Sequence, residues 1–151
     1  WIRAKAPDVD LQATISEIRP DGKETFVQGG WLRASRRKLS PRKSTLLEPA
    51  LSLRREDLAK LPKGRFTKVI IPLYYQGHVY RAGSRIRVTI SAPGGDQPIW
   101  SFAETVPRSP MRVTVAFSHK HPSRLILPLI RGLAAPTPLP PCPSLRGEPC
   151  R

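Results

Sequence analysis

Cysteine is nearly absent from the sequence, and long apolar runs are absent altogether. Cys142 and Cys150, the only two cysteines among 151 residues, both lie near the C-terminus. Neither has His or further Cys neighbours at the spacing of a zinc site, so we expect two independent thiols. No apolar run approaches the ~20 residues of a transmembrane helix, and the chain does not open with a basic stretch followed by an apolar one. The sequence therefore predicts no membrane span.

Acidic residues are also scarce, numbering 11 against 26 Lys and Arg, which gives a net charge of +15 and a pI near 11.1. Such an excess makes nucleic acid a possible partner, because neutralised phosphates release their counterions. However, the basic residues are mostly Arg and are scattered, with one tight cluster at Arg36–Lys38. A nucleic-acid footprint gathers its charge on one face. We therefore disfavour a nucleic-acid partner.

Aromatic residues make up only 7% of the chain. Trp1, Trp31, Trp100 and Phe102 are too dispersed to predict a base-stacking platform, and we expect them to fill the core.

A serine nucleophile on a G-x-S-x-G elbow is missing as well. Ser84 in "AGSRI" comes nearest, but it lacks the second Gly and lies where a strand begins. Asp8 and Asp10 stand two apart at a strand start, where turn capping or an ion pair with Arg is expected. The Gly-rich loop around Asp96 lacks the "GK[ST]" ending of a phosphate-binding loop. We predict no catalytic residue and no cofactor or cofactor-binding residue.

The three histidines give no site either. His78 lies near several tyrosines, so a packed or hydrogen-bonded role is favoured over a general base. His119 and His121 form an H-x-H pair that could share one side of a strand, but no Cys or carboxylate nearby in sequence completes a metal site. We therefore predict no metal ligand.

Alternating residues predict β-structure from the start of the chain. Val9, Leu11, Ala13 and Ile15 fall on one face and polar residues on the other, the pattern of a half-buried strand. "RPDGK" at Arg19–Lys23 has turn chemistry, and "ETFVQGGWLRAS" resumes an extended pattern. We expect a hairpin, with a bulge or bend at Gly29–Gly30 near Trp31.

The middle of the chain predicts a long loop followed by further strands. Arg36–Gly64 is basic, proline-interrupted and without a period, with one short helical turn expected at "REDLAKL". Residues 66–80 resume an extended pattern, and Pro72 makes this an edge or bulged strand. In residues 84–92 the alternation places Ile86, Val88 and Ile90 inward and Arg85, Arg87 and Thr89 outward.

Two more strands are expected in "MRVTVAF" and "RLILPLI", residues 111–117 and 124–130. Six or seven strands without a long helix predict an all-β sandwich or jelly roll. Beyond Gly132, six prolines occur in nineteen residues, so we expect disorder from about Ala134 onward. The abrupt change of composition there also raises the hypothesis of a shifted reading frame.

Three ordered stretches, residues 6–37, 61–94 and 121–130, resemble the C-terminal domain of the X-Pro dipeptidyl-peptidase and cocaine-esterase-type (CocE/NonD) serine hydrolases. The shared pattern is a D-x-D strand leading to a P-D-G hairpin, an H-x-[FY]-R-x-G-x-R-[IL]-R strand and an H-P-S-[RY]-L-x-L-P ending. The matching positions are Asp8, Asp10, Pro20, Asp21, Gly22, Arg33, His78, Arg81, Gly83, Arg85, Arg87, His121, Pro122, Ser123 and Pro128.

The resemblance implies a jelly-roll β-sandwich of galactose-binding-like fold over residues 1–132, followed by a proline-rich tail at 133–151. It implies attachment to an α/β-hydrolase domain that carries the Ser-Asp-His triad, and a homo-oligomer through that parent. The start at Trp1 would then lie inside the jelly roll, leaving room for an absent early strand. The chain alone is predicted to be inactive, and the cytoplasm is the favoured compartment. A free-standing carbohydrate-binding module stays open as an alternative.

Overall fold

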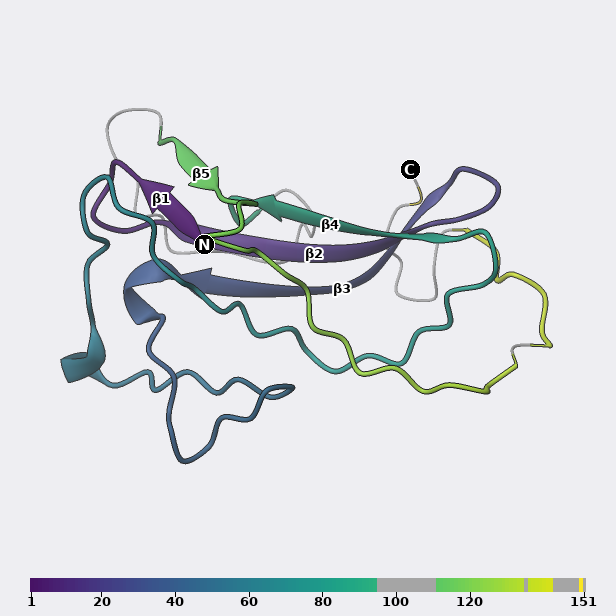
Figure 1. Cartoon of the computed structure of the whole chain (residues 1–151). Helices are drawn as coiled ribbons and strands as arrows, with labels where there is room; N and C mark the ends of the chain where they lie inside the picture. The colour runs from purple at the N-terminus through teal and green to yellow at the C-terminus, as the bar shows by residue number, and fades with distance from the viewer. Residues whose placement is uncertain (95–110, 135, 143–149, 151) are drawn as a thin grey trace.

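The chain is an all-β protein built from two antiparallel sheets, as a computed structural model of residues 1–94, 111–134, 136–142 and 150 shows (Figure 1). One sheet pairs β1 with β5, and the other has the order β3-β2-β4. The strands are β1 (Ile2–Ala4), β2 (Asp10–Ile18), β3 (Glu24–Arg33), β4 (Arg85–Ser91) and β5 (Val113–Val115). The predicted all-β sandwich is confirmed, while the jelly-roll topology and the galactose-binding-like assignment stay predictions. Among the described residues, no helix has the length and apolar character of a membrane span.

The core lies where the small sheet packs on one end of the long one. Ile2 and Ala4 of β1 are buried together with Val9 and Leu11, and Ala34 and Leu61 complete the cluster. Val69 and Ile71 pack against it from the segment that follows the long loop. This segment touches the small sheet at one bridge, where Ile2 and Thr67 exchange backbone hydrogen bonds of 3.0 and 2.8 Å.

Strands β2 and β3 form the predicted hairpin. The turn is closed by hydrogen bonds from the Arg19 N–H to the Lys23 carbonyl and from the Gly22 N–H to the Arg19 carbonyl, both 2.9 Å long. Gly22 has a φ of 82°, a conformation that side chains disfavour, and Asp21 accepts from the Lys23 N–H. Local turn chemistry is therefore enough to place this hairpin.

The bulge predicted at Gly29–Gly30 lies elsewhere. The two glycines pair in register with Thr14 and Ala13, and the register shifts between Ile15 and Ser16, which leaves Val27 as the extra residue of β3. Gly30 serves a different purpose. A Cβ built on it would stand 1.9 Å from the carbonyl oxygen of Pro72, because the segment after the long loop crosses β3 at this point.

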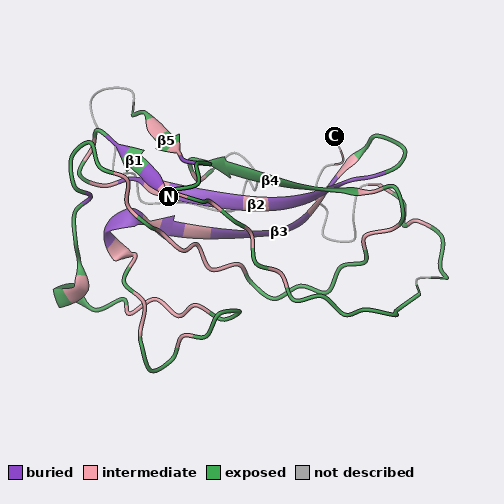
Figure 2. Cartoon of the chain, viewed as in Figure 1, coloured by how far each residue is buried: buried purple, intermediate pink, exposed green. Residues whose placement is uncertain are grey.

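Strand β2 is buried on both faces rather than one (Figure 2). Gln12 and Ser16, expected to face solvent, are only 1% and 3% exposed. The prediction failed because side chains of the neighbouring strand cover this face. The Trp31 indole donates to the Gln12 amide oxygen at 3.0 Å, and the Ser16 hydroxyl donates to Glu24 at 2.5 Å.

Strand β4 forms where predicted, but its apolar residues are not buried. Ile86, Val88 and Ile90 are 47%, 45% and 39% exposed, and Figure 2 shows β4 exposed along its length. They pair in register with Glu17, Ile15 and Ala13, so they extend the inner face of the sheet. Among the described residues, the layer that covers β2 and β3 does not reach β4.

Two predicted strands are replaced by irregular chain. Residues 66–80 and 124–130 contain no strand, and only the single bridge at Thr67 joins the former to a sheet. Pro72 and Pro128 lack the N–H that a ladder needs. The segment 66–80 still faces the core, as expected from its apolar pattern, and it forms part of the second layer.

The long loop contains the predicted helical turn, η2 (Arg55–Asp57), and begins with a second one, η1 (Ala34–Arg36). Asp57 joins two parts of this loop. Its side chain is 6% exposed and accepts a hydrogen bond from the Lys38 amine. The bond from Lys38, followed by one from Ser52, lowers the pKa of Asp57 to about 2.

We expect Lys38→Met to raise the pKa of Asp57 toward its ordinary value of 3.8, because the largest cause of the shift is removed. A carboxyl pKa that is lower in the folded chain stabilises the loop at pH values above the pKa of the unfolded chain. This stabilisation is lost as the pH falls through about 2, the pKa in the folded chain. A carboxyl-detected NMR titration measures both values. An Asp57 carboxyl that titrates near 3.8 in the unaltered chain would contradict the assignment.

Candidate functional site

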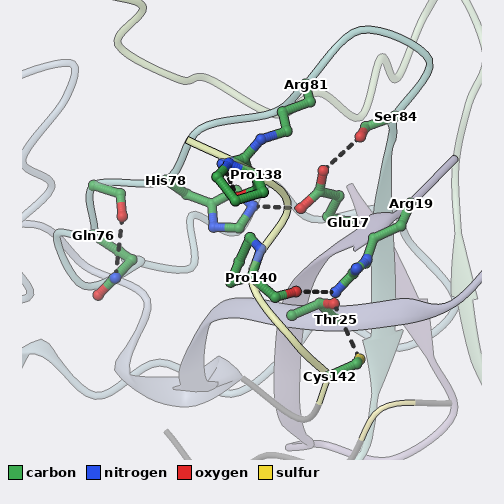
Figure 3. A network of polar contacts seen from close by, with 11 residues as sticks. Glu17, Arg19, Thr25, Gln76, His78, Arg81, Ser84, Pro138, Pro140 and Cys142 are labelled. Carbon is green, nitrogen blue, oxygen red and sulfur yellow. Dashed lines mark hydrogen bonds and ion pairs between the residues drawn. The ribbon is translucent and has the colours of Figure 1, made fainter. Parts of the chain in front are cut away.

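The structure gathers three polar side chains at the hairpin end of the inner face. Glu17 of β2 is buried, with a side chain only 4% exposed. Its Oε1 accepts a hydrogen bond of 2.5 Å from the Ser84 hydroxyl, and its Oε2 lies 2.8 Å from His78 Nε2 (Figure 3). The three residues, here called the Glu17 cluster, are far apart in sequence and meet because the segment before β4 folds back over β2.

A tight turn positions the Glu17 cluster. The Ser84 N–H donates to the Arg81 carbonyl at 3.0 Å, and Gly83 takes a φ of 84°, so the predicted "RAG" turn is confirmed. The ring of Tyr80 meets the His78 ring edge-on, with centroids 4.7 Å apart. Burial, followed by the negative charge of Glu17, raises the pKa of the Tyr80 hydroxyl. The cluster is thus held from the strand, the turn and the preceding segment.

The order of groups in the Glu17 cluster differs from that of a catalytic triad. In a triad the histidine lies between the serine and the carboxylate, and takes the serine proton as general base. Here the carboxylate lies in the middle, and the Ser84 hydroxyl donates its hydrogen bond directly to Glu17. Histidine-assisted activation of Ser84 is not available in this geometry. The arrangement instead fastens the turn before β4 to the central strand.

Glu17 was missed in the reading of the sequence, although a signal was present. It occupies the next inward position after Val9, Leu11, Ala13 and Ile15, so the alternation places a carboxylate on the apolar face. A buried carboxylate requires hydrogen-bond partners. The partners themselves, at positions 78 and 84, could not be read from β2.

The remaining acidic candidates have the structural roles expected of them. Asp8 accepts hydrogen bonds from the backbone N–H of Val9 and Ser35, at 3.0 and 2.7 Å. Asp10 binds the Arg33 guanidinium through both carboxylate oxygens, at 2.7 and 2.8 Å. The predicted ion pair with Arg is therefore confirmed for Asp10, whereas Asp8 binds backbone N–H groups, one of them in η1 and 27 positions away. Asp96, Trp100 and Phe102 lie outside the described residues.

The histidine pair does not form a metal centre in the described part of the chain. The His121 ring packs between Trp1 and Phe66, with ring centroids 4.9 and 4.8 Å away, whereas His119 is exposed. No group of three His, Cys, Asp or Glu side chains suited to a metal occurs among residues 1–94, 111–134, 136–142 and 150.

The prediction of two independent thiols is wrong. Cys142 and Cys150 form a disulfide, with Cα atoms 5.6 Å apart. Because only eight positions separate them, the bond closes a small loop within the tail and does not tie the tail to either sheet.

Comparison with known proteins agrees with the all-β fold and with the absence of a catalytic triad from the Glu17 cluster. Residues 1–126 match the family model described as the X-Pro dipeptidyl-peptidase C-terminal non-catalytic domain. The fold is similar to part of a CocE/NonD family hydrolase from Staphylococcus aureus, with a TM-score of 0.57 and 28% sequence identity. The alignment covers 66% of this chain and 20% of that one, so the chain matches about a fifth of its relative. The comparison with curated proteins found no match. The chain belongs to the family of X-Pro dipeptidyl-peptidase C-terminal non-catalytic domains.

Proposed function

We propose that the chain is the non-catalytic domain of a CocE/NonD-type serine hydrolase and packs against an α/β-hydrolase domain through β4. The observation that carries this proposal is the exposed apolar stripe of Ile86, Val88 and Ile90. These residues alternate as buried residues do and continue the inner face formed by Ala13 and Ile15. A contiguous apolar surface on a folded domain is typical of an interface.

The domain's contribution is structural in this proposal. It supplies a rigid sheet that supports the hydrolase domain, which carries the nucleophile and its base. The proposed unit is residues 1–132, and the proline-rich residues 133–151 form an appended tail.

The gene provides the first test. We expect the coding sequence upstream of Trp1 to contain an in-frame hydrolase segment with a G-x-S-x-G elbow. A start codon just before Trp1, with nothing in frame beyond it, would instead support a free-standing module and make glycan binding the next assay.

The interface provides the second test. Val88→Lys should weaken association of the chain with the separately expressed hydrolase segment by at least about tenfold, because a charge would be buried at the contact. Thr89→Lys is the matched control, since it adds the same charge to the opposite face of β4. Both variants should leave the free energy of unfolding within about 0.5 kcal/mol of the unaltered chain, because both positions are exposed.

Titration calorimetry measures the association, and p-nitrophenyl ester cleavage by each component alone gives the baseline, which we expect to be nil for this chain. Equal binding by both variants would remove β4 as the interface.

A further inference from the structure

The proline-rich tail lies against two arginines from distant parts of the domain. The Arg19 guanidinium donates to the Pro140 carbonyl at 2.9 Å (Figure 3). The Arg81 guanidinium donates to the carbonyls of Thr137 and Pro138, at 3.2 and 3.1 Å, and to the Thr137 hydroxyl at 3.2 Å.

A third contact joins the tail to strand β3. The hydroxyl of Thr25, on β3 opposite Glu17, lies 3.7 Å from Cys142 Sγ. A disulfide sulfur carries no proton, so the hydroxyl is the donor. The tail therefore crosses the hairpin end of the inner face, beside the Glu17 cluster.

Hydrogen bonds from arginine to backbone carbonyls are well suited to binding a proline-rich segment. Proline has no N–H, so such a segment presents mostly carbonyl acceptors to a partner, and among residues 136–142 only Thr137, Leu139 and Cys142 keep a backbone N–H. Two of the three captured carbonyls, those of Thr137 and Pro140, belong to amides that precede a proline. These tertiary amides are strong acceptors that have no N–H of their own. Arginine offers five donors and no acceptor, which matches this surface.

The two arginines are partly or fully buried in the domain, whereas the tail residues that they contact are mostly exposed. Arg19 is 8% exposed, and the Nε atoms of Arg19 and Arg81 are buried without a hydrogen-bond partner among the described residues. Of residues 136–142, only Leu139 and Cys142 are even partly buried. The segment is held by its carbonyls and not by burial of its side chains.

We propose that Arg19, Arg81 and Thr25 form a binding site for an extended proline-rich peptide, and that residues 136–142 occupy this site as a ligand within the same chain. The short covalent tether gives the tail an effective concentration in the millimolar range, so a separate peptide of the same kind binds measurably only when the tail is weakened. The site is independent of the hydrolase domain, and its test leaves the exposed apolar residues of β4, Ile86, Val88 and Ile90, unchanged.

The first experiment measures order in the tail of the full chain. In ¹⁵N-labelled protein, the Thr137 and Leu139 amides should have order parameters close to the rigid-backbone value of about 0.85, and Arg81→Gln should lower them below about 0.6. Arg85→Gln is the matched control, because Arg85 is an exposed neighbour that carries the same charge. Low order in the unaltered chain, or no change in Arg81→Gln, overturns the proposal.

The second experiment adds a peptide to the full chain. The probe is acetyl-APTPLPPS-amide with a fluorescent label, and the protein carries Ser in place of Pro136, Pro138, Pro140 and Pro141. We expect saturable binding, at least about tenfold tighter than to the unaltered chain, and loss of binding when Arg81→Gln is added. Any of three results overturns the proposal. The tail variant binds the peptide equally well with and without Arg81→Gln, the tail variant and the unaltered chain bind it equally well, or the tail variant does not bind it at millimolar concentration.

Discussion

Gly30→Ala is expected to destabilise the domain by roughly 1–3 kcal/mol, the range typical of an overpacked interior. The added Cβ would stand 1.9 Å from the Pro72 carbonyl oxygen and 2.9 Å from its carbonyl carbon. Both are backbone atoms, so no side chain can rotate out of the way. The crossing segment must move, and with it Ile71, which packs against the core. Urea unfolding followed by tryptophan fluorescence measures the loss.

Gly29→Ala is the matched control for this experiment. The nearest atom to its added Cβ would be the Ala13 carbonyl oxygen at 3.5 Å, an ordinary contact. Because glycine within a strand costs roughly 0.5–1 kcal/mol relative to alanine, this variant should be neutral or slightly more stable. Equal effects of the two substitutions would show that the segment at Pro72 does not cross β3 at Gly30.

Glu17→Ala is expected to lower the free energy of unfolding by roughly 2–4 kcal/mol, since it leaves two partly buried polar groups without their common partner. The Ser84 hydroxyl and the His78 ring both depend on this carboxylate. Loss of the contact frees the turn before β4 as well as the strand end. Urea unfolding gives the magnitude, and NMR signals of the His78 ring report the local change.

Glu17→Gln separates shape from charge at the same position. The amide keeps an acceptor for Ser84 and offers a donor to His78, so the expected loss is about 1 kcal/mol. Glu56→Ala is the control for removing a carboxylate, because the Glu56 side chain is 65% exposed. If Glu17→Ala and Glu56→Ala had equal effects, the Glu17 cluster would not stabilise the fold.

Features decided by neighbouring residues could be predicted. The hairpin follows from alternation on both sides of Pro20-Asp21-Gly22, because the turn closes through bonds between residues at most four apart. The places of Asp8 and Asp10 at the start of a strand predicted their kind of role, whereas their partners Ser35 and Arg33 lie 27 and 23 positions away. The family resemblance agrees with the matched residues 1–126.

Burial could be predicted only in part. Alternation in β2 and β4 shows which side chains share a face, but not whether another layer covers that face. Gln12 was expected outside and is buried beneath Trp31, whereas Val88 was expected inside and is 45% exposed. Both errors have one cause, namely that alternation along one strand does not show which side chains of other strands or segments lie over each face.

The sequence by itself determined the all-β class, the hairpin and the family, because these depend on period-two patterning, local turn chemistry and ordered motifs. Only the tertiary structure decided the Glu17 cluster and the tail contacts. His78 lies 61 positions from Glu17, and Thr137 lies 56 positions from Arg81. Contacts over such separations form only after the sheets have brought the segments together. For the same reason, the need for glycine at position 30 becomes visible only once Pro72 lies above it.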